Sequence, residues 1–265
     1  IGDMAFFNCT SLKSIKIPES VTSIGHSSFR SCSSLTNINI PEGVTSIGNS
    51  AFSFCNSLNY NEYDNAYYLG NENNPYLALI KAKDTSVESC SINENTKFIM
   101  SSAFEQCSLL TSITIPDGVA SIGSWIFAKC SSLKSITLPD SVTSIESYAF
   151  YYCTSLTSIA LPDSITNIEM WAFADCSALT SIILPDGVTS IGLGAFRNCA
   201  SLTNITLPDS VTIIEDSVFY GCIKLTDITY NGTLAQWDAV AKHYLWDTNT
   251  SDYTIHCTDV DITKN

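Results

Sequence analysis

Basic residues are scarce in this sequence. Lys and Arg together number 12 against 26 Asp and Glu, so the formal net charge is −14. Nucleic acids and anionic membrane surfaces both require a basic face, so this balance argues against both kinds of partner. Charged residues of either sign make up only 14% of the chain, against about 25% in an ordinary globular protein. Serine and threonine, at 64 positions, supply most of the polar surface instead.

Long apolar runs and catalytic motifs are missing as well. No apolar stretch approaches the roughly 18 residues of a membrane span. The chain has three histidines, and none belongs to a zinc-binding, nucleophile-elbow or phosphate-loop pattern. Cysteines and histidines do not cluster with the spacing of metal ligands. The sequence therefore predicts a protein that is not an enzyme, with no catalytic residues, no metal site and no cofactor.

An internal repeat organises almost the whole chain. Nine cysteines, from Cys9 to Cys222, follow a period of 23 residues, and a phenylalanine stands three residues before each of them. Proline keeps the same period in seven repeats. Only the interval from Cys55 to Cys107 is irregular, six residues longer than two periods. Three columns that share one period are the signature of a solenoid, in which each coil packs on its neighbours.

The repeat unit predicts the path of one coil. L-x-x-I-x-L is typical of a short strand with its apolar residues pointing inward. The Pro-Asp pair that follows is typical of a turn, and V-T-S-I-G forms a second extended segment. We expect A-F-x-x-C to close the coil as a short helical turn with the ring and the sulfur buried. The fold class is thus a solenoid of α/β repeats, with short parallel strands and short helical turns.

Two segments depart from the repeat. An irregular coil over about residues 58–86 contains two β-rich runs around an Asn/Pro turn, which predicts a hairpin over residues 66–81. Residues 234–243 favour an amphipathic helix with Thr233 as its N-cap, and residues 253–257 favour a final strand. We therefore divide the chain into a solenoid, residues 1–229, and a C-terminal capping segment, residues 230–265. The chain starts in the middle of a repeat, so we expect a fragment of a longer protein, whose open first coil favours self-association.

The unit L-x-x-I-x-L-P-x-x-V-x-x-I-G-x-x-A-F-x-x-C resembles that of the BspA-like leucine-rich repeat family of bacterial cell-surface proteins. The likeness covers nearly the whole chain, and seven coils carry the unit with few changes. The hairpin insert and the Tyr-Asn-Gly-Thr segment that opens the cap are also similar to pieces found in this family. The resemblance implies a right-handed leucine-rich-repeat solenoid within a secreted or wall-attached protein that acts in adhesion or protein binding.

Two columns of the repeat carry potentially reactive groups, and each has a structural explanation. The nine cysteines point the same way in successive coils, so we expect free, buried thiols rather than disulfides. An acidic residue follows each repeat proline, and these carboxylates serve the turns, with weak cation binding as the alternative. The acidic column comprises Glu19, Glu42, Asp117, Asp140, Asp163, Asp186 and Asp209.

Variation among the coils points to a sharper candidate. The position two residues before the repeat phenylalanine carries Trp125, Tyr148 and Trp171 in three consecutive coils. Large rings stacked at coil spacing are costly to leave in water, and exposed patches of this kind mark interaction sites. We call these three residues the aromatic ridge. Its sequence neighbours complete the set of candidate ligand-binding residues: Met170, Tyr151 and Tyr152. The alternative is that the rings pack on one another and only stiffen the rod.

The hairpin is the second candidate surface. Its residues include four tyrosines, Tyr63, Tyr67, Tyr68 and Tyr76. Insertions in solenoids often map to a binding face. The alternative is that the insert only covers the defect left by the irregular coil.

The function favoured by these features is a non-enzymatic adhesion or interaction module that binds a surface protein of a host or neighbouring cell. A carbohydrate-binding module that uses the ridge is the alternative, because flat aromatic rings also stack on sugars. A ligand-free structural stalk is the third hypothesis. We expect an extracellular, cell-surface location, no direct insertion into a membrane and no nucleic-acid partner.

Overall fold

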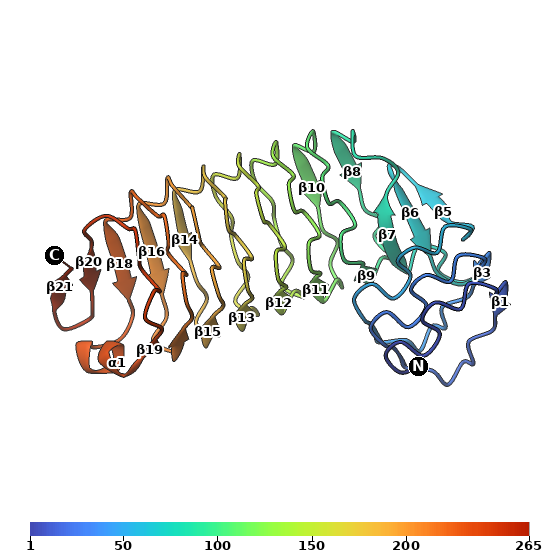
Figure 1. Cartoon of the computed structure of the whole chain (residues 1–265), viewed down its shortest axis with the longest axis horizontal. Helices are drawn as coiled ribbons and strands as arrows, with labels where there is room; N and C mark the ends of the chain where they lie inside the picture. Colours follow the sequence, from blue (N-terminus) through green and yellow to red (C-terminus); the bar gives the residue numbers. More distant parts are fainter. Residues whose placement is uncertain (265) are drawn as a thin grey trace.

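The computed structural model describes residues 1–264. The chain forms a curved rod of stacked coils with its two termini at opposite ends (Figure 1). Each coil lies one repeat along from its neighbour, so that Ser14 pairs with Asn37 and Ser121 pairs with Ser144. The predicted parallel solenoid is therefore confirmed.

The first face of the solenoid is made by the L-x-x-I-x-L strands. Side chains alternate along a strand, so Ile113 and Ile205 are buried while Ser112 and Asn204 before them face solvent. The strands of this face pair in parallel, and isolated bridges continue it between β10 and β14. They are β1 (Ser14–Ile15), β3 (Asn37–Ile38), β8 (Ser89–Ser91), β10 (Ser112–Thr114), β14 (Ser181–Ile183), β16 (Asn204–Leu207), β18 (Asp227–Tyr230) and β20 (Thr254–His256).

The second face is made by the V-T-S-I strands, which are only two residues long. Their isoleucines enter the same core from the other side, as Ile122 and Ile145 do. This face consists of β2 (Ser23–Ile24), β4 (Ser46–Ile47), β9 (Phe98–Ile99), β11 (Ser121–Ile122), β12 (Ser144–Ile145), β13 (Asn167–Ile168), β15 (Ser190–Ile191), β17 (Ile213–Ile214) and β19 (Ala241–Lys242).

The third face consists of hydrogen-bonded turns, so the expected helical turns are wrong. Each regular coil holds two residues with left-handed backbone, such as Trp125 (φ 62°) and Lys129 (φ 63°). Residues in that conformation cannot continue a right-handed helix. The N–H groups of Trp125, Phe127 and Lys129 instead donate to carbonyls of the next coil at 3.1, 2.9 and 2.6 Å. Phe127 and Cys130 are buried as predicted.

The phenylalanines of the third face stack along the rod. From Phe104 to Phe219, neighbouring ring centroids lie 5.3–5.9 Å apart. Beside them the cysteines from Cys32 to Cys222 are buried free thiols, as predicted, whereas Cys9, which was expected to be buried with them, is exposed. Seven of these thiols donate to a phenylalanine carbonyl of the preceding coil, for example Cys153 to Phe127 at 3.1 Å. Cys107, which follows the irregular coil, donates to the Asp84 carbonyl at 3.9 Å instead.

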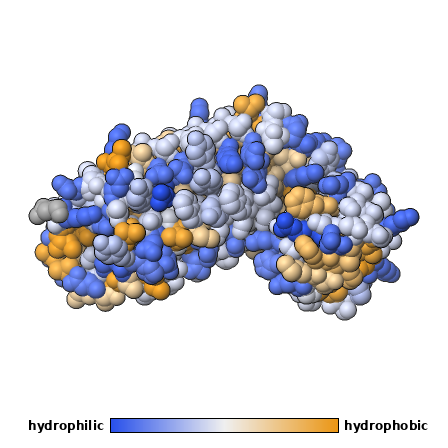
Figure 2. Space-filling model, viewed as in Figure 1, coloured by the Kyte–Doolittle hydropathy of each residue, from blue (hydrophilic) through white to orange (hydrophobic). Residues whose placement is uncertain are grey.

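The insert forms the predicted hairpin. β6 (Ala66–Leu69) and β7 (Ala78–Ala82) are antiparallel, and β5 (Asn61–Tyr63) pairs with β6 as a third antiparallel strand. β7 pairs in parallel with β9, whereas within residues 1–264 β4 pairs with β2 alone. The stack of strands is therefore interrupted between β4 and β7, and the buried residues form two separate core clusters. Figure 2 shows the outline hollowed on its lower edge where the N-terminal coils meet the rest of the rod.

The C-terminal segment closes the core as expected. α1 (Leu234–Ala239) is the only α-helix in the described part of the chain. Thr233 caps it, and Gln236 completes a capping box. The helix ends earlier than predicted because Ala241 and Lys242 pair with β17 as β19. β20 pairs with β18, and β21 (Asp261–Thr263) adds an antiparallel edge strand.

Candidate interaction surfaces

The structure brings the three ridge residues together as one stack on the third face. The ring of Tyr148 lies 4.1 Å from that of Trp125 and 6.0 Å from that of Trp171, with interplanar angles of 11° and 9°. All three side chains are half-buried. One ridge residue therefore follows another at coil spacing, with the ring edges at the surface.

The backbone of the ridge is one that bulky residues rarely adopt. Trp125, Tyr148 and Trp171 have φ values of 62°, 61° and 58°, in the left-handed region that costs an L-residue about 1–2 kcal/mol. Other coils fill the same position with serine, as at Ser27 and Ser217. The fold thus accepts a small residue at this position. The backbone therefore does not require the aromatic residues that three coils carry there.

The neighbours of the ridge complete the surface. Tyr151 packs edge-on against all three rings, at centroid distances of 6.0, 5.8 and 6.4 Å. Burial, followed by the charge of Asp175, raises the pKa of the Tyr151 hydroxyl. Tyr152 is 48% exposed and Met170 is 37% exposed. A shallow groove of about 420 Å³ lies beside Tyr151 and Tyr152 and is also lined by Lys129.

Two residues that the sequence analysis did not select limit the ridge at its C-terminal side. The guanidinium of Arg197 lies 5.4 Å from the ring centroid of Trp171 and 4.1 Å from that of Tyr220, so it covers both rings. Gly194, in the ridge column itself, leaves room for the indole of Trp171. The glycine that follows three aromatic residues in this column was the signal available in the sequence.

The hairpin tyrosines do not form one surface. Tyr68 was one of the candidate residues of this second surface, and its fully buried side chain excludes it from contact with a partner. Its hydroxyl accepts a hydrogen bond from the N–H of Asn93 at 3.4 Å, and burial raises its pKa. Tyr63 and Tyr76 pack against Tyr68 on the same side of the sheet. Tyr67 lies on the opposite side because neighbouring residues of a strand alternate, and there it contacts Tyr60 at 5.4 Å.

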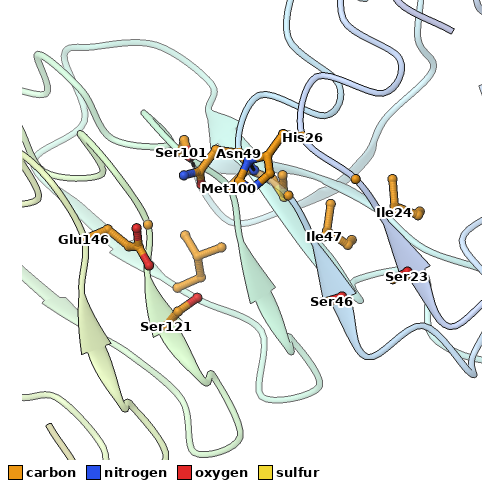
Figure 3. Close-up of a pocket in the computed structure, with 14 residues that line it drawn as sticks. Ser23, Ile24, His26, Ser46, Ile47, Asn49, Met100, Ser101, Ser121 and Glu146 are labelled. Atoms are coloured by element: carbon orange, nitrogen blue, oxygen red, sulfur yellow. Dashed lines mark hydrogen bonds between the residues drawn. The ribbon is translucent and has the colours of Figure 1, made fainter. Parts of the chain in front are cut away.

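A groove of about 490 Å³, which no sequence pattern indicated, lies where the N-terminal coils meet the rest of the rod (Figure 3). Asn49 bridges these two parts: its Oδ1 accepts from the Ser101 hydroxyl at 2.6 Å, and its Nδ2 donates to the Ser124 hydroxyl at 3.3 Å. On the far side of the groove, burial and the charge of Glu169 raise the pKa of Glu146. Polar contacts across this groove, and not continuous strand pairing, thus join the N-terminal coils to the rest of the rod.

Within residues 1–264, no group of three or more histidine, cysteine or acidic residues is arranged to hold a metal ion. In the same range, no helix is both long enough and apolar enough to cross a membrane.

Comparison with known proteins identifies the repeat. The pattern described as a BspA type leucine rich repeat region matches the chain in six copies, over residues 1–72, 82–178 and 143–244. A search of curated proteins finds no match.

Solved structures share the fold. A leucine-rich repeat protein of T. pallidum is 31% identical over 57% of this chain and 72% of its own, with a TM-score of 0.54. A leucine-rich cell surface protein of Faecalibacterium prausnitzii A2-165 is 28% identical over 91% of this chain and 85% of its own, with a TM-score of 0.51. A leucine-rich repeat protein of Bacteroides ovatus ATCC 8483 is 28% identical over 97% of this chain and 66% of its own, with a TM-score of 0.56.

Proposed function

The chain belongs to the BspA-type leucine-rich repeat family, and on that basis we propose that it is a cell-surface interaction module that binds a protein partner through the aromatic ridge. A repeat protein of the bacterial cell-surface type is consistent with an interaction or a structural role. The ridge is the single observation that favours interaction over a purely structural role.

The ridge is rigid before any partner arrives. Each ring of Trp125, Tyr148 and Trp171 is held by a stacked neighbour and by the edge of Tyr151. Binding therefore orders few additional side chains, and preorganisation of this kind lowers the entropic cost of association. Tyr and Trp are also the side chains most often found as anchors at protein interfaces.

A protein partner suits this geometry better than a sugar. A sugar stacks on an open ring face, and both faces of Tyr148 are covered by the neighbouring rings. The face of Trp171 that points away from Tyr148 meets Gly194 and Arg197. Tyr152 and Met170 beside the ridge are exposed, and they match the mixed apolar and polar contacts of a protein interface.

A binding screen with a matched variant tests the proposal. The variant replaces Trp125, Tyr148 and Trp171 by serine, the residue that the same column carries at Ser27 and Ser217 with similar φ. The native chain and the variant are screened against extracellular matrix proteins and against glycans. The proposal expects a matrix protein that binds the native chain, is not displaced by oligosaccharides and is lost in the variant.

Other results of this screen would favour a carbohydrate-binding module or a structural stalk. Binding that oligosaccharides displace and that quenches tryptophan fluorescence would identify a carbohydrate-binding module. Binding retained by the variant would remove the ridge from the interface. Full biological function of the variant without any ligand would identify a stalk.

A further inference from the structure

One coil of the third face, beside the hairpin, donates none of the main-chain hydrogen bonds that join other coils of this face to the next coil. In seven other coils, three alternate N–H groups donate to carbonyls of the next coil, as Ser27, Phe29 and Ser31 do at 3.0, 2.9 and 2.8 Å. The equivalent donors of the following coil are the N–H groups of Ser50, Phe52 and Phe54. Within residues 1–264, no carbonyl or side chain accepts from any of these three groups. An unpaired row of backbone donors is a template for another extended segment.

The opposite wall of the gap belongs to a coil two repeats further along the chain. In the regular coils, these donors reach the coil that follows in the chain, which here is the irregular coil that carries the hairpin. The irregular coil pairs instead with the coil after it: the N–H of Ala82 donates to the Ala103 carbonyl at 2.7 Å, and the Cys107 thiol donates to the Asp84 carbonyl at 3.9 Å. The insert therefore leaves the three donors of the coil before it without their usual acceptors.

The gap is an open groove of about 410 Å³. Ser50, Phe52 and Phe54 form one wall, and Ser102 and Glu105 form part of the other. The groove is distinct from the ridge, because it shares no lining residue with it. An edge that is free to solvent and lies in a groove of this size satisfies the requirements of strand addition, in which main-chain bonds give affinity and side-chain pockets give selectivity.

The groove also gathers positive charge in an acidic protein. Arg30 and Lys81 line it against one acidic residue, Glu105, although the chain has only 12 basic residues against 26 acidic ones. The Arg30 guanidinium lies 5.1 Å from the ring centroid of Phe54, and the Lys81 ammonium lies 5.6 Å from that of Tyr60. Phe54 is 61% exposed. The groove thus combines backbone donors, two cations and an exposed ring.

We propose that this groove is a second binding site, which takes an extended peptide segment of a partner protein with acidic side chains. Carbonyls of the peptide accept from the N–H groups of Ser50, Phe52 and Phe54, in the place of the carbonyls that the next coil supplies elsewhere in the rod. Carboxylates of the peptide pair with Arg30 and Lys81 at the rim. A polypeptide is favoured over a glycan because the three donors follow the alternate-residue spacing that other coils satisfy with main-chain carbonyls.

Amide hydrogen exchange tests the main-chain part of the proposal. The probe is an end-blocked hexapeptide of alternating valine and aspartate, with the valine and lysine version as its control. In the free protein, the amides of Ser50, Phe52 and Phe54 exchange quickly, and a saturating amount of the acidic probe slows them by about tenfold. The amide of Ser102, which donates to Ser124, serves as the internal reference and does not change.

Charge reversal tests the side-chain part. Arg30→Glu with Lys81→Glu should weaken binding of the aspartate probe by about tenfold or more and improve binding of the lysine probe. Lys16→Glu with Lys134→Glu, on the exposed first face, should leave both affinities unchanged. The ridge serine variant should also bind the probe normally, which separates this site from the proposed function.

Three results would overturn the proposal. The first is slow exchange of all three amides in the free protein, because the gap would then be closed. The second is no protection of these amides by the aspartate probe in a protein whose melting curve is native. The third is binding of a galacturonate hexamer, instead of the peptide, that is lost on charge reversal, because the site would then recognise an acidic glycan.

Discussion

Gly194 provides the space that the indole of Trp171 occupies: a Cβ built on this glycine would lie 3.3 Å from Cε2 of that ring. Gly194 is the next member of the ridge column and keeps its left-handed backbone, at φ 61°. The ridge therefore ends at Gly194, which has no side chain and leaves that space to the Trp171 ring of the preceding coil. The guanidinium of Arg197 then covers the same ring.

Gly194→Ala should destabilise the protein by about 1–2 kcal/mol, because alanine is strained at this φ and its methyl group contacts the ring. Urea unfolding followed by circular dichroism measures the loss. Ser217→Ala, in the same column at φ 58°, is the control and should change stability far less. In a Trp171→Ser background the loss should shrink, since only the backbone strain remains. An equal loss of stability in both backgrounds would show that the Trp171 ring does not require a glycine at position 194.

Phe150→Ala should cost about 3–5 kcal/mol, because it removes a ring from the middle of a close-packed stack. Phe150 is fully buried, 5.5 Å from Phe127 and 5.3 Å from Phe173. Coils contact only their neighbours, so the thermal melt should also split into two transitions. Tyr152→Ala, at a side chain that is 48% exposed, is the control. A single transition for the Phe150 variant would mean that the coils are more strongly coupled than the nearest-neighbour description allows.

The cysteine column should be inert in the native protein. Burial raises the pKa of Cys55 to about 11 and that of Cys107 to about 12, and the thiolate is the reactive form. Cys9 is exposed and Cys257 is partly exposed, whereas the other nine cysteines are buried. Titration with a thiol reagent should therefore detect Cys9 first and Cys257 slowly, and all eleven thiols after unfolding. Rapid labelling of the buried nine under native conditions would contradict the packing described here.

The C-terminal strands should lose stability as the pH rises. The ring nitrogens of His256 lie 3.0 Å from carboxylate oxygens of Asp227 and Asp261, and hydrogen bonds to Asp227 and then to Asp261 raise its pKa. A group whose pKa is raised by folding stabilises the protein fully below its unfolded pKa of about 6.5 and stops doing so above its folded pKa. Hydrogen bonds from Thr226 and His256 lower the pKa of Asp227, so its contribution disappears as the pH falls below about 4.

Thermal melts at several pH values test this arrangement. The native chain should melt at a higher temperature near pH 5.5 than near pH 8.5, and His256→Gln should reduce this difference. His243, which lies 3.5 Å from Glu215, is the control site for a His243→Gln variant. An unchanged difference in the His256 variant would show that another group titrates.

The features that the sequence predicted correctly depend on local or periodic signals. The 23-residue period places the strands and the phenylalanine stack, and Thr233 marks the start of α1 as its N-cap. The Asn/Pro turn between β6 and β7 likewise predicts the hairpin. Each of these depends on neighbours in the same coil or on an identical coil next to it.

The features that the sequence missed depend on contacts between unlike segments. Tyr68 is adjacent to Tyr67 in a strand whose inner face cannot be chosen until its partners are known, so its burial was not predictable. The interruption between β4 and β7 depends on where the insert enters the stack. The turns of the third face were assigned to a helix because A-F-x-x-C carries helix-like spacing, although its left-handed residues exclude one.

The affinity of one partner for the native chain and for the ridge serine variant tests the central claim most directly. The claim is that the stacked rings of Trp125, Tyr148 and Trp171 form the surface that a protein partner binds. Removal of interface anchors of this kind raises Kd by about 30-fold or more. A rise of that size, with the melting curve of the variant still cooperative and the peptide groove still functional, is the result that the account predicts. An unchanged Kd would contradict it and leave the ridge as a stiffening element of the rod.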